Sequence, residues 1–118
     1  MNLYAKLLER DAAGRPVTVG LIGAGKFGTM FLSQARLTRG LHVAGVADLD
    51  TTRARNQLKS AGWPDNQYAA ASLDDAHKAR TTLVTDRAAM LIADPRIEML
   101  VEATGVPGAG IHHCLQAI

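Results

Sequence analysis

The sequence predicts an α/β fold in which helices cover both faces of a doubly wound parallel sheet. Short β-branched apolar runs alternate along the 118 residues with segments whose apolar residues recur at helical spacing. The runs are nearly continuous, as is typical of parallel strands that are buried on both faces. Because 47% of the residues are hydrophobic, the chain can bury the core of one domain. We therefore expect three layers and the strand order 3-2-1-4, in a sheet that is incomplete within this chain.

The first half of the chain predicts an N-terminal arm, two strands and two helices. Residues 1–15 form a surface helix or arm with a weak helical period, and the domain itself covers residues 16–118. The elements that follow are a strand at 17–22, an amphipathic helix from Phe27 to about Gly40, a strand at 41–47, and a helix to about Ala61 that Asp50 or Thr51 caps.

The second half predicts a less regular segment, two more strands and two more helices. Residues 67–82 include a short helix that Ser72 caps, with Asp74 and Asp75 in its first turn. The remaining elements are a strand at 81–85, a helix at 86–93 that Pro95 ends, a strand at 97–104, and a helix that begins near Pro107 and still continues at residue 118.

Three spaced glycines lie between the first strand and the first helix of the domain. Gly23, Gly25 and Gly28 form the pattern G-x-G-x-x-G in the context that a Rossmann-type dinucleotide site requires. Gly23 allows a tight turn, Gly25 lets the backbone approach a pyrophosphate, and Gly28 lets helix and strand pack closely. The phosphates would rest on N–H groups at the helix N-terminus. Lys26 either adds positive charge there or is a solvated lysine. The alternative is a glycine-rich turn that binds nothing.

A carboxylate follows the second strand, 20 residues after Gly28. Asp48 can accept hydrogen bonds from both hydroxyls of an adenosine ribose and would repel a 2′-phosphate, which favours NAD. Arg53 and Arg55 lie in the first turns of the next helix, and either can reach a 2′-phosphate, so NADP stays open. The alternatives are that Asp48 is a strand-end turn residue and that the arginines belong to a solvated helix face.

The fourth strand ends in a third informative stretch, "VEATG", at residues 101–105. Its small residues would lie beside the first glycine loop, where the nicotinamide half of a dinucleotide binds. Thr104 can hydrogen-bond a ribose, and Gly105 permits close approach of the backbone. The alternative is an ordinary strand-to-helix loop in which Thr104 caps the helix.

Other polar residues give no catalytic or metal-binding pattern. His112 and His113 point about 100° apart on a helix and cannot hold one ion from one face. Helix capping and a solvated turn account for Asp74, Asp75 and His77, and Cys114 fits a buried thiol at helical spacing. We therefore expect no catalytic residue and no metal site in this chain.

Composition excludes several classes of partner. The net charge is only +2 and the basic residues are scattered, so we expect no nucleic-acid binding. No apolar run approaches the ~20 residues of a membrane-spanning helix, and the N-terminus lacks the features of a signal peptide, which predicts a soluble, cytoplasmic protein without a membrane partner. Exposed edges of an incomplete sheet favour self-association into a homo-oligomer.

Three stretches of the chain resemble a known family: "VGLIGAGKFG", "VAGVADLD" and "ADPRIEMLVEATG". They are similar to the N-terminal NAD(P)-binding domain of homoserine-dehydrogenase-like oxidoreductases, which share a layout with the glucose-fructose oxidoreductase group. The opening "MNLYAKLLER" resembles the subgroup that carries a C-terminal SAF-type domain, including the deoxyxylulose-phosphate reductoisomerase-like enzymes. The resemblance spans nearly the whole chain, and it is specific for the cofactor fold but not for a substrate.

This resemblance implies roles for individual residues. Asp48 becomes the contact to the adenosine ribose. The other implied contacts are a pyrophosphate loop of Gly23, Ala24, Gly25, Lys26, Phe27 and Gly28, and a nicotinamide side of Ala103, Thr104 and Gly105. Two departures matter: residues 67–82 are longer than a compact crossover needs, and the chain ends before the domain in which such enzymes place their catalytic groups. No catalytic residue can therefore be carried over.

The expected function is that of the NAD(P)-binding domain of an oxidoreductase. Such an enzyme transfers hydride between the nicotinamide and a small carbonyl or hydroxy substrate, which a C-terminal domain absent from this chain would contact. The chain alone should bind cofactor without turnover. One alternative is a non-catalytic dinucleotide sensor or scaffold. Another is an S-adenosylmethionine-dependent methyltransferase, although its loop usually reads G-x-G-x-G and this chain has Phe27 at the corresponding position.

Overall fold

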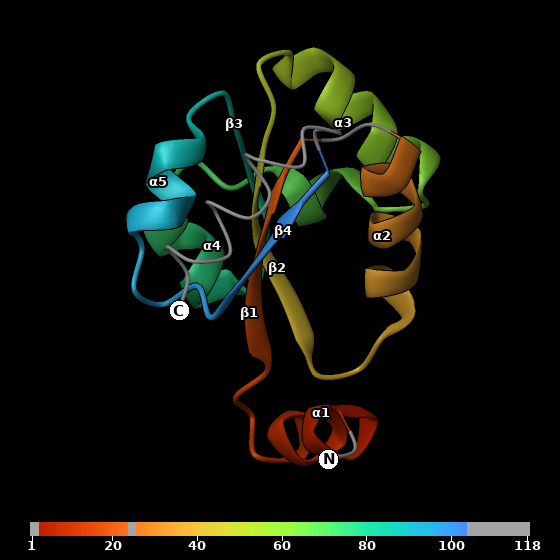
Figure 1. The fold of residues 1–118 in the computed structure, drawn as a ribbon, viewed down its shortest axis with the longest axis vertical. Coiled ribbons are helices and arrows are strands. Elements are labelled where there is room, and N and C mark those ends of the chain that lie inside the picture. The colour runs from red at the N-terminus through yellow and green to blue at the C-terminus, as the bar shows by residue number, and fades with distance from the viewer. Residues whose placement is uncertain (1–2, 24–25, 104–118) are drawn as a thin grey trace.

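Four strands form a single parallel sheet at the centre of the molecule. The structure is a computed structural model that describes residues 3–23 and 26–103. The strands are β1 (Val17–Ile22), β2 (Leu41–Ala47), β3 (Leu83–Thr85) and β4 (Met99–Glu102). Their order is β3-β2-β1-β4 and every neighbouring pair is parallel (Figure 1). The predicted α/β class and the predicted strand order are confirmed.

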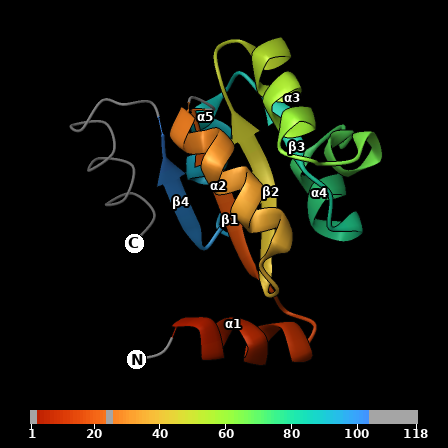
Figure 2. The same ribbon diagram turned by 90° about the vertical axis from the view of Figure 1, so that its right-hand side faces the viewer.

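Helices lie on both faces of this sheet (Figures 1 and 2). The helices of the chain are α1 (Leu3–Ala12), which lies at one end of the sheet, and α2 (Lys26–Leu37), α3 (Thr51–Ser60), α4 (Leu73–Ala79) and α5 (Ala88–Ala93), with a 3₁₀ turn, η1, at Asp65–Tyr68. Helices α2 and α3 cover one face, whereas α4 and α5 cover the other. The described part of the chain therefore has three layers, as predicted.

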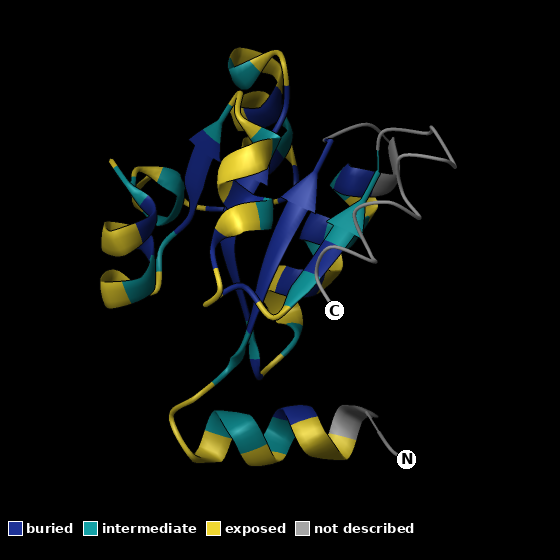
Figure 3. Ribbon diagram, turned by 60° about the vertical axis from the view of Figure 1, so that its left-hand side comes forward, coloured by how far each residue is buried: buried dark blue, intermediate teal, exposed yellow. Residues whose placement is uncertain are grey.

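The core divides into two apolar clusters, one on each face of the sheet. Successive residues of β1 belong to opposite clusters, because side chains alternate between the two faces of a strand. Leu21 packs with Leu32 of α2 and Leu58 of α3. Ile22 packs with Leu91 of α5 on the other face. β1 and β2 are almost entirely buried, β4 is mostly half-buried, and the outer faces of the helices are exposed (Figure 3). This explains why β1 and β2 read as nearly continuous apolar runs.

Side chains fix the starts of two helices at the predicted positions. The Asp50 carboxylate accepts a hydrogen bond from the Arg53 amide at 3.0 Å, and the Ser72 hydroxyl accepts one from the Asp75 amide at 3.1 Å. The predicted helix from Pro107, with His112, His113 and Cys114, lies outside the described residues.

The connection between β2 and β3 crosses from one face of the sheet to the other. It contains α3 on one face, then η1, then α4 on the opposite face, which accounts for the length of residues 67–82. The 3₁₀ turn was not predicted. Gln67 at this turn is tied to the end of α4, because its side-chain Nε2 donates to the carbonyl of Arg80 at 2.7 Å and its own carbonyl accepts from the Thr82 amide at 2.8 Å.

Helix α1 lies across the end of the sheet at which β1 and β2 begin (Figure 2). Leu7 is buried there, and a Cβ at Gly40 would overlap its backbone. Arg10 pairs with Glu98 at 2.8 Å, so α1 also contacts the segment that leads into β4. Within the described part of the chain, no helix is long and apolar enough to cross a bilayer.

Candidate functional site

The carboxyl ends of β1, β2 and β4 bring three predicted stretches together at one edge of the sheet. Ile22, the last residue of β1, is in register with Ala47 of β2 and with Glu102 of β4. The next residue of each strand therefore lies at the same edge. These three residues are Gly23, Asp48 and Ala103.

Backbone hydrogen bonds extend the sheet into these residues. The Gly23 amide donates to the carbonyl of Ala47 at 2.7 Å, and the Ala103 amide donates to the carbonyl of Ile22 at 2.8 Å. On the other side, the Asp48 amide donates to the carbonyl of Thr85 at 2.9 Å. Because each strand end is held by its neighbour, the edge is a rigid platform for the loops that follow.

Two of the three glycines occupy positions where a side chain would not fit. Gly23 has a φ of 85°, in the left-handed region that L-residues rarely adopt. A Cβ at Gly28 would lie 2.8 Å from the carbonyl oxygen of Gly23, so the first turn of α2 packs directly against the strand end. These are the roles predicted for the first and third glycines. Ala24 and Gly25 lie outside the described residues, as do the side chains of Lys26 and Phe27.

Asp48 lies at the predicted end of β2, but its carboxylate is covered. The side chain is only 3% exposed. Its Oδ1 accepts from the Asp50 amide at 2.9 Å and from Nη2 of Arg53 at 2.8 Å, and its Oδ2 accepts from the same nitrogen at 3.0 Å. A buried carboxylate needs such compensation, because leaving water is costly for a charge.

Arg53 is therefore part of the site, because its guanidinium pairs with the Asp48 carboxylate. Its side chain is 58% exposed, so the guanidinium lies between the carboxylate and solvent. Any hydroxyl that approaches Asp48 from solvent must displace or share this arginine. Arg55, the other arginine considered from the sequence, is exposed and makes no polar contact with any described residue.

An exposed leucine beside Asp48 was missed by the sequence reasoning. Leu49 is 94% exposed and is the most exposed of the large apolar side chains in the described part of the chain. The exposure of Leu49 could have been predicted from its position between two aspartates, after a strand and before a helix cap, where no core residue is expected. Leu49 adds an apolar surface at the same edge of the sheet.

The nicotinamide side of the predicted site is described only in part. Ala103 packs at the margin of the cluster formed with α2 and α3, and its amide is held by β1. Thr104 and Gly105 lie outside the described residues. The register of β1 and β4 places Ala103 beside Gly23. The roles of Thr104 and Gly105 remain predictions.

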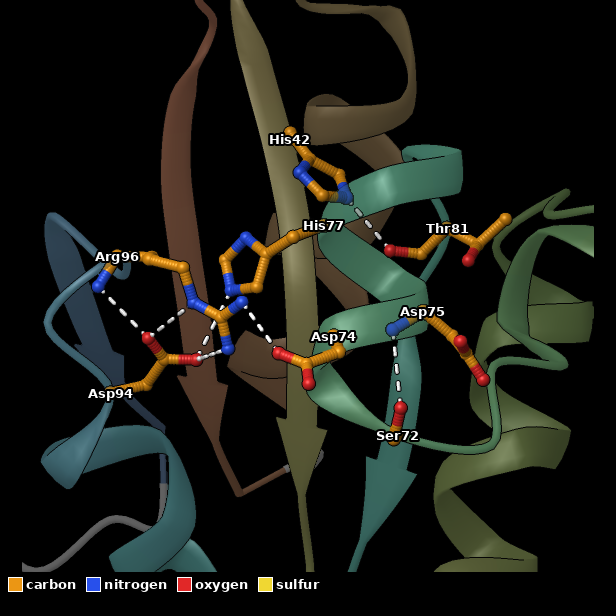
Figure 4. Close-up of polar contacts among 8 residues, drawn as sticks. All are labelled: His42, Ser72, Asp74, Asp75, His77, Thr81, Asp94 and Arg96. Carbon is orange, nitrogen blue, oxygen red and sulfur yellow. Dashed lines mark hydrogen bonds and ion pairs between the residues drawn. The ribbon is translucent and has the colours of Figure 1, made fainter.

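A second polar group connects α4 with the turn after α5 (Figure 4). Asp94 has a side chain only 4% exposed and accepts hydrogen bonds from the Arg96 backbone and side chain at 2.9–3.0 Å and from His77 Nε2 at 3.1 Å. Burial by itself would raise the pKa of Asp94, but these hydrogen bonds outweigh burial and lower the pKa to about 2. Arg96 also donates to Asp74 at 2.7 Å.

This polar group is a structural tie and not part of the sheet-edge site. Helix capping and a solvated turn were predicted for Asp74, Asp75 and His77, and the hydrogen bond from the Asp75 amide to the Ser72 hydroxyl agrees with the capping. His77 instead faces Asp94, which the sequence did not suggest because the two residues are 17 positions apart. The ring of His42, at the start of β2, lies beside the ring of His77. His42 donates from Nε2 to the carbonyl of Thr81 at 2.7 Å.

Comparisons with known proteins do not assign a family. No protein-family model matches the sequence, and the search of curated proteins gives no significant match. In residues 3–23 and 26–103, no three His, Cys, Asp or Glu side chains are grouped so that they could hold a metal ion. The function must therefore be argued from the sheet edge itself.

Proposed function

We propose that this chain is the NAD(P)-binding domain of an oxidoreductase, with a Rossmann-type fold and a homoserine-dehydrogenase-like layout. The observation that carries the proposal is the adjacency of Gly23, Asp48 and Ala103 at the carboxyl ends of β1, β2 and β4. Ligands of open parallel sheets bind outside this edge, where the order of strands reverses. In the order β3-β2-β1-β4 the reversal falls between β1 and β4.

The pyrophosphate would bind at the start of α2. The left-handed turn at Gly23 and the close packing at Gly28 bring the first turn of this helix against the end of β1. Amide groups at a helix N-terminus lack intrahelical acceptors, and the helix dipole favours an anion there. The geometry therefore supports a phosphate-binding role for residues 23–28, with Gly25 permitting close approach of the phosphates as the sequence predicts.

The adenosine half would lie over Asp48 and Leu49. The exposed Leu49 side chain offers apolar contact to an adenine ring, and the Asp48 carboxylate accepts hydrogen bonds from the ribose. NAD is favoured by Asp48, whereas the Arg53 guanidinium beside it would attract a 2′-phosphate and keeps NADP open. Binding of either form requires Arg53 to move or to share the carboxylate.

The nicotinamide half would extend toward Ala103, Thr104 and Gly105. The bound nicotinamide supplies the hydride chemistry, while this chain binds and orients it. A small carbonyl or hydroxy substrate would be held by a further domain of the kind that such oxidoreductases carry. The chain alone should therefore bind cofactor without turnover.

Separate fluorescence titrations with NADH and NADPH test this proposal. We expect wild-type protein to bind NADH in the micromolar to millimolar range, roughly −8 to −4 kcal/mol. The variant Asp48→Ala should lose more affinity for NADH than for NADPH, because it removes the ribose acceptor and releases Arg53. An equal loss for both cofactors would refute the ribose assignment. Binding of S-adenosylmethionine in place of either would refute the function.

A further inference from the structure

A cavity of about 510 Å³ opens at the end of the sheet opposite to the proposed dinucleotide site. Its walls come from four separate parts of the chain: the turn after α1, the end of α2 with the start of β2, the segment that joins α3 to η1, and the end of α4. The lining includes Arg36, His42, Trp63, Gln67 and Arg80. Its volume falls within the range of small-molecule sites, about 300–1,000 Å³.

The charges that line this cavity are predominantly positive. The guanidinium of Arg36 makes no hydrogen bond or ion pair with any described residue, and it lies against the backbone of Gly62, where a Cβ would be 3.0 Å from its Nε. Arg80 donates only to the carbonyl of Gly14, at 2.8 Å. The one carboxylate in the lining, Asp11, is already paired with Arg39 at 2.9 Å. Among the described residues, neither of these two guanidinium groups has an anionic partner.

The rest of the lining combines apolar surface with fixed polar groups. Trp63 is buried and is held in place because its Nε1 donates to the carbonyl of Leu32 at 3.0 Å. Leu41 and Val43 at the start of β2 extend this apolar wall. A site with apolar walls and guanidinium groups at its margin fits a molecule with an apolar body and an anionic head, since Arg binds carboxylate and phosphate oxygens in a forked geometry.

We propose that this cavity binds a small organic anion, with an apolar or aromatic body against Trp63 and a carboxylate or phosphate on Arg36 and Arg80. The site is separate from the dinucleotide site. His42 begins the buried run of β2 and Asp48 follows its end, so the two sites are about 20 Å apart along the strand. The proposal therefore does not depend on the function proposed above.

Trp63 provides a local probe because it is the only tryptophan in the chain. Phenyl phosphate titrated into wild-type protein should change the tryptophan emission in a saturable manner. Benzyl alcohol, which has the ring without the charge, should bind at least tenfold more weakly, and inorganic phosphate should compete with phenyl phosphate. Benzoate serves as the carboxylate probe and distinguishes the two anionic heads. Absence of a saturable change with both phenyl phosphate and benzoate would overturn the proposal.

Arg36→Gln tests the cationic margin. This variant should weaken phenyl phosphate at least tenfold while NADH affinity and the circular dichroism spectrum stay unchanged, since Arg36 has no polar partner to lose. Arg55→Gln removes the same charge from α3 outside the cavity lining and should keep wild-type affinity for phenyl phosphate. Equal weakening by both variants would show nonspecific attraction and refute the site. If Arg36→Gln alters the fold, added KCl on wild-type protein tests the contribution of charge, because it should weaken phenyl phosphate but not benzyl alcohol. Equal affinity for phenyl phosphate at low and high KCl would refute a cationic site.

Discussion

Arg53 covers the carboxylate of Asp48 with a single nitrogen, Nη2, which is 2.8 Å from Oδ1 and 3.0 Å from Oδ2. The pair combines the two opposing determinants of dinucleotide preference, a carboxylate that suits a ribose hydroxyl and a guanidinium that suits a 2′-phosphate. Preference between NAD and NADP in this chain should therefore depend on which partner Arg53 contacts. This relationship gives the first prediction.

The variant Arg53→Gln should increase the preference for NADH over NADPH by about tenfold, ~1.4 kcal/mol. Removing the guanidinium takes away the cation that would attract a 2′-phosphate, while the Asp48 carboxylate keeps its hydrogen bond from the Asp50 amide and stays as an acceptor for a ribose hydroxyl. Parallel fluorescence titrations of both cofactors measure the ratio. Arg55→Gln is the matched control, because Arg55 is exposed on the same helix and makes no polar contact with any described residue. An unchanged ratio in Arg53→Gln would show that the ion pair plays no part in cofactor choice.

The variant Gly28→Ala should destabilise the protein by about 1–3 kcal/mol, because a Cβ there would be 2.8 Å from the carbonyl oxygen of Gly23. It should also weaken NADH, since relief of the clash moves α2 away from the strand end. Urea unfolding followed by circular dichroism measures the first effect. Gln34→Ala, at an exposed position of the same helix, should change stability by no more than about 0.5 kcal/mol. Equal stability of the two variants would contradict the packing role of Gly28.

The pair formed by Asp94 and Arg96 should stabilise the fold above about pH 4 and lose that effect as the pH falls toward 2. The pKa of Asp94 is lowered in the folded protein from 3.8 to about 2, so the unfolded chain takes up the proton first as the pH falls. Asp94→Asn should cost about 1–2 kcal/mol at pH 7, since the exposed Arg96 is partly screened by water. Urea unfolding across this range measures the effect, with the exposed Asp86→Asn as control. A pH profile that Asp94→Asn leaves unchanged would refute the assignment.

His42 should make the fold less stable as the pH falls below about 6.5. Burial lowers the pKa of His42, and the charge of Arg80 lowers it further. The hydrogen bond to the Thr81 carbonyl favours the charged imidazole and raises the pKa, but it does not outweigh burial. The unfolded chain therefore protonates first, and stability decreases with falling pH. His42→Gln retains an N–H donor without the titration and should flatten the profile between pH 7 and 5.5. Profiles of equal slope would contradict this role.

Local patterns in the sequence were sufficient to predict four strands and two helix caps, although β3 (Leu83–Thr85) and β4 (Met99–Glu102) are shorter than the predicted 81–85 and 97–104. β1 and β2 have the predicted bounds, because their apolar runs stop at Gly23, where the backbone turns through a positive φ, and at Asp48, where a carboxylate replaces the apolar side chains. Asp50 and Ser72 cap the helices that the sequence assigned to them, since capping depends on residues only three positions apart.

Interactions between distant segments could not be predicted in the same way. The pairing of Arg10 with Glu98 joins residues 88 positions apart, and η1 depends on contacts of Gln67 with the segment after α4. The ion pair between Asp48 and Arg53 is intermediate between a local pattern and a contact of distant segments. The two residues are five positions apart, and the sequence suggested both, but only the packing of α3 beside β2 decides that they meet.

Amide chemical shifts measured by NMR during an NADH titration test the central claim most directly. If the carboxyl edge of the sheet holds the dinucleotide, the amide signals of Gly23, Gly28 and Ala103 should move to saturation. Those of Gly14 and Gly40, at the opposite end of the sheet, should stay in place. Shifts confined to Gly14 and Gly40, with the three edge amides unmoved at saturating NADH, would contradict the account.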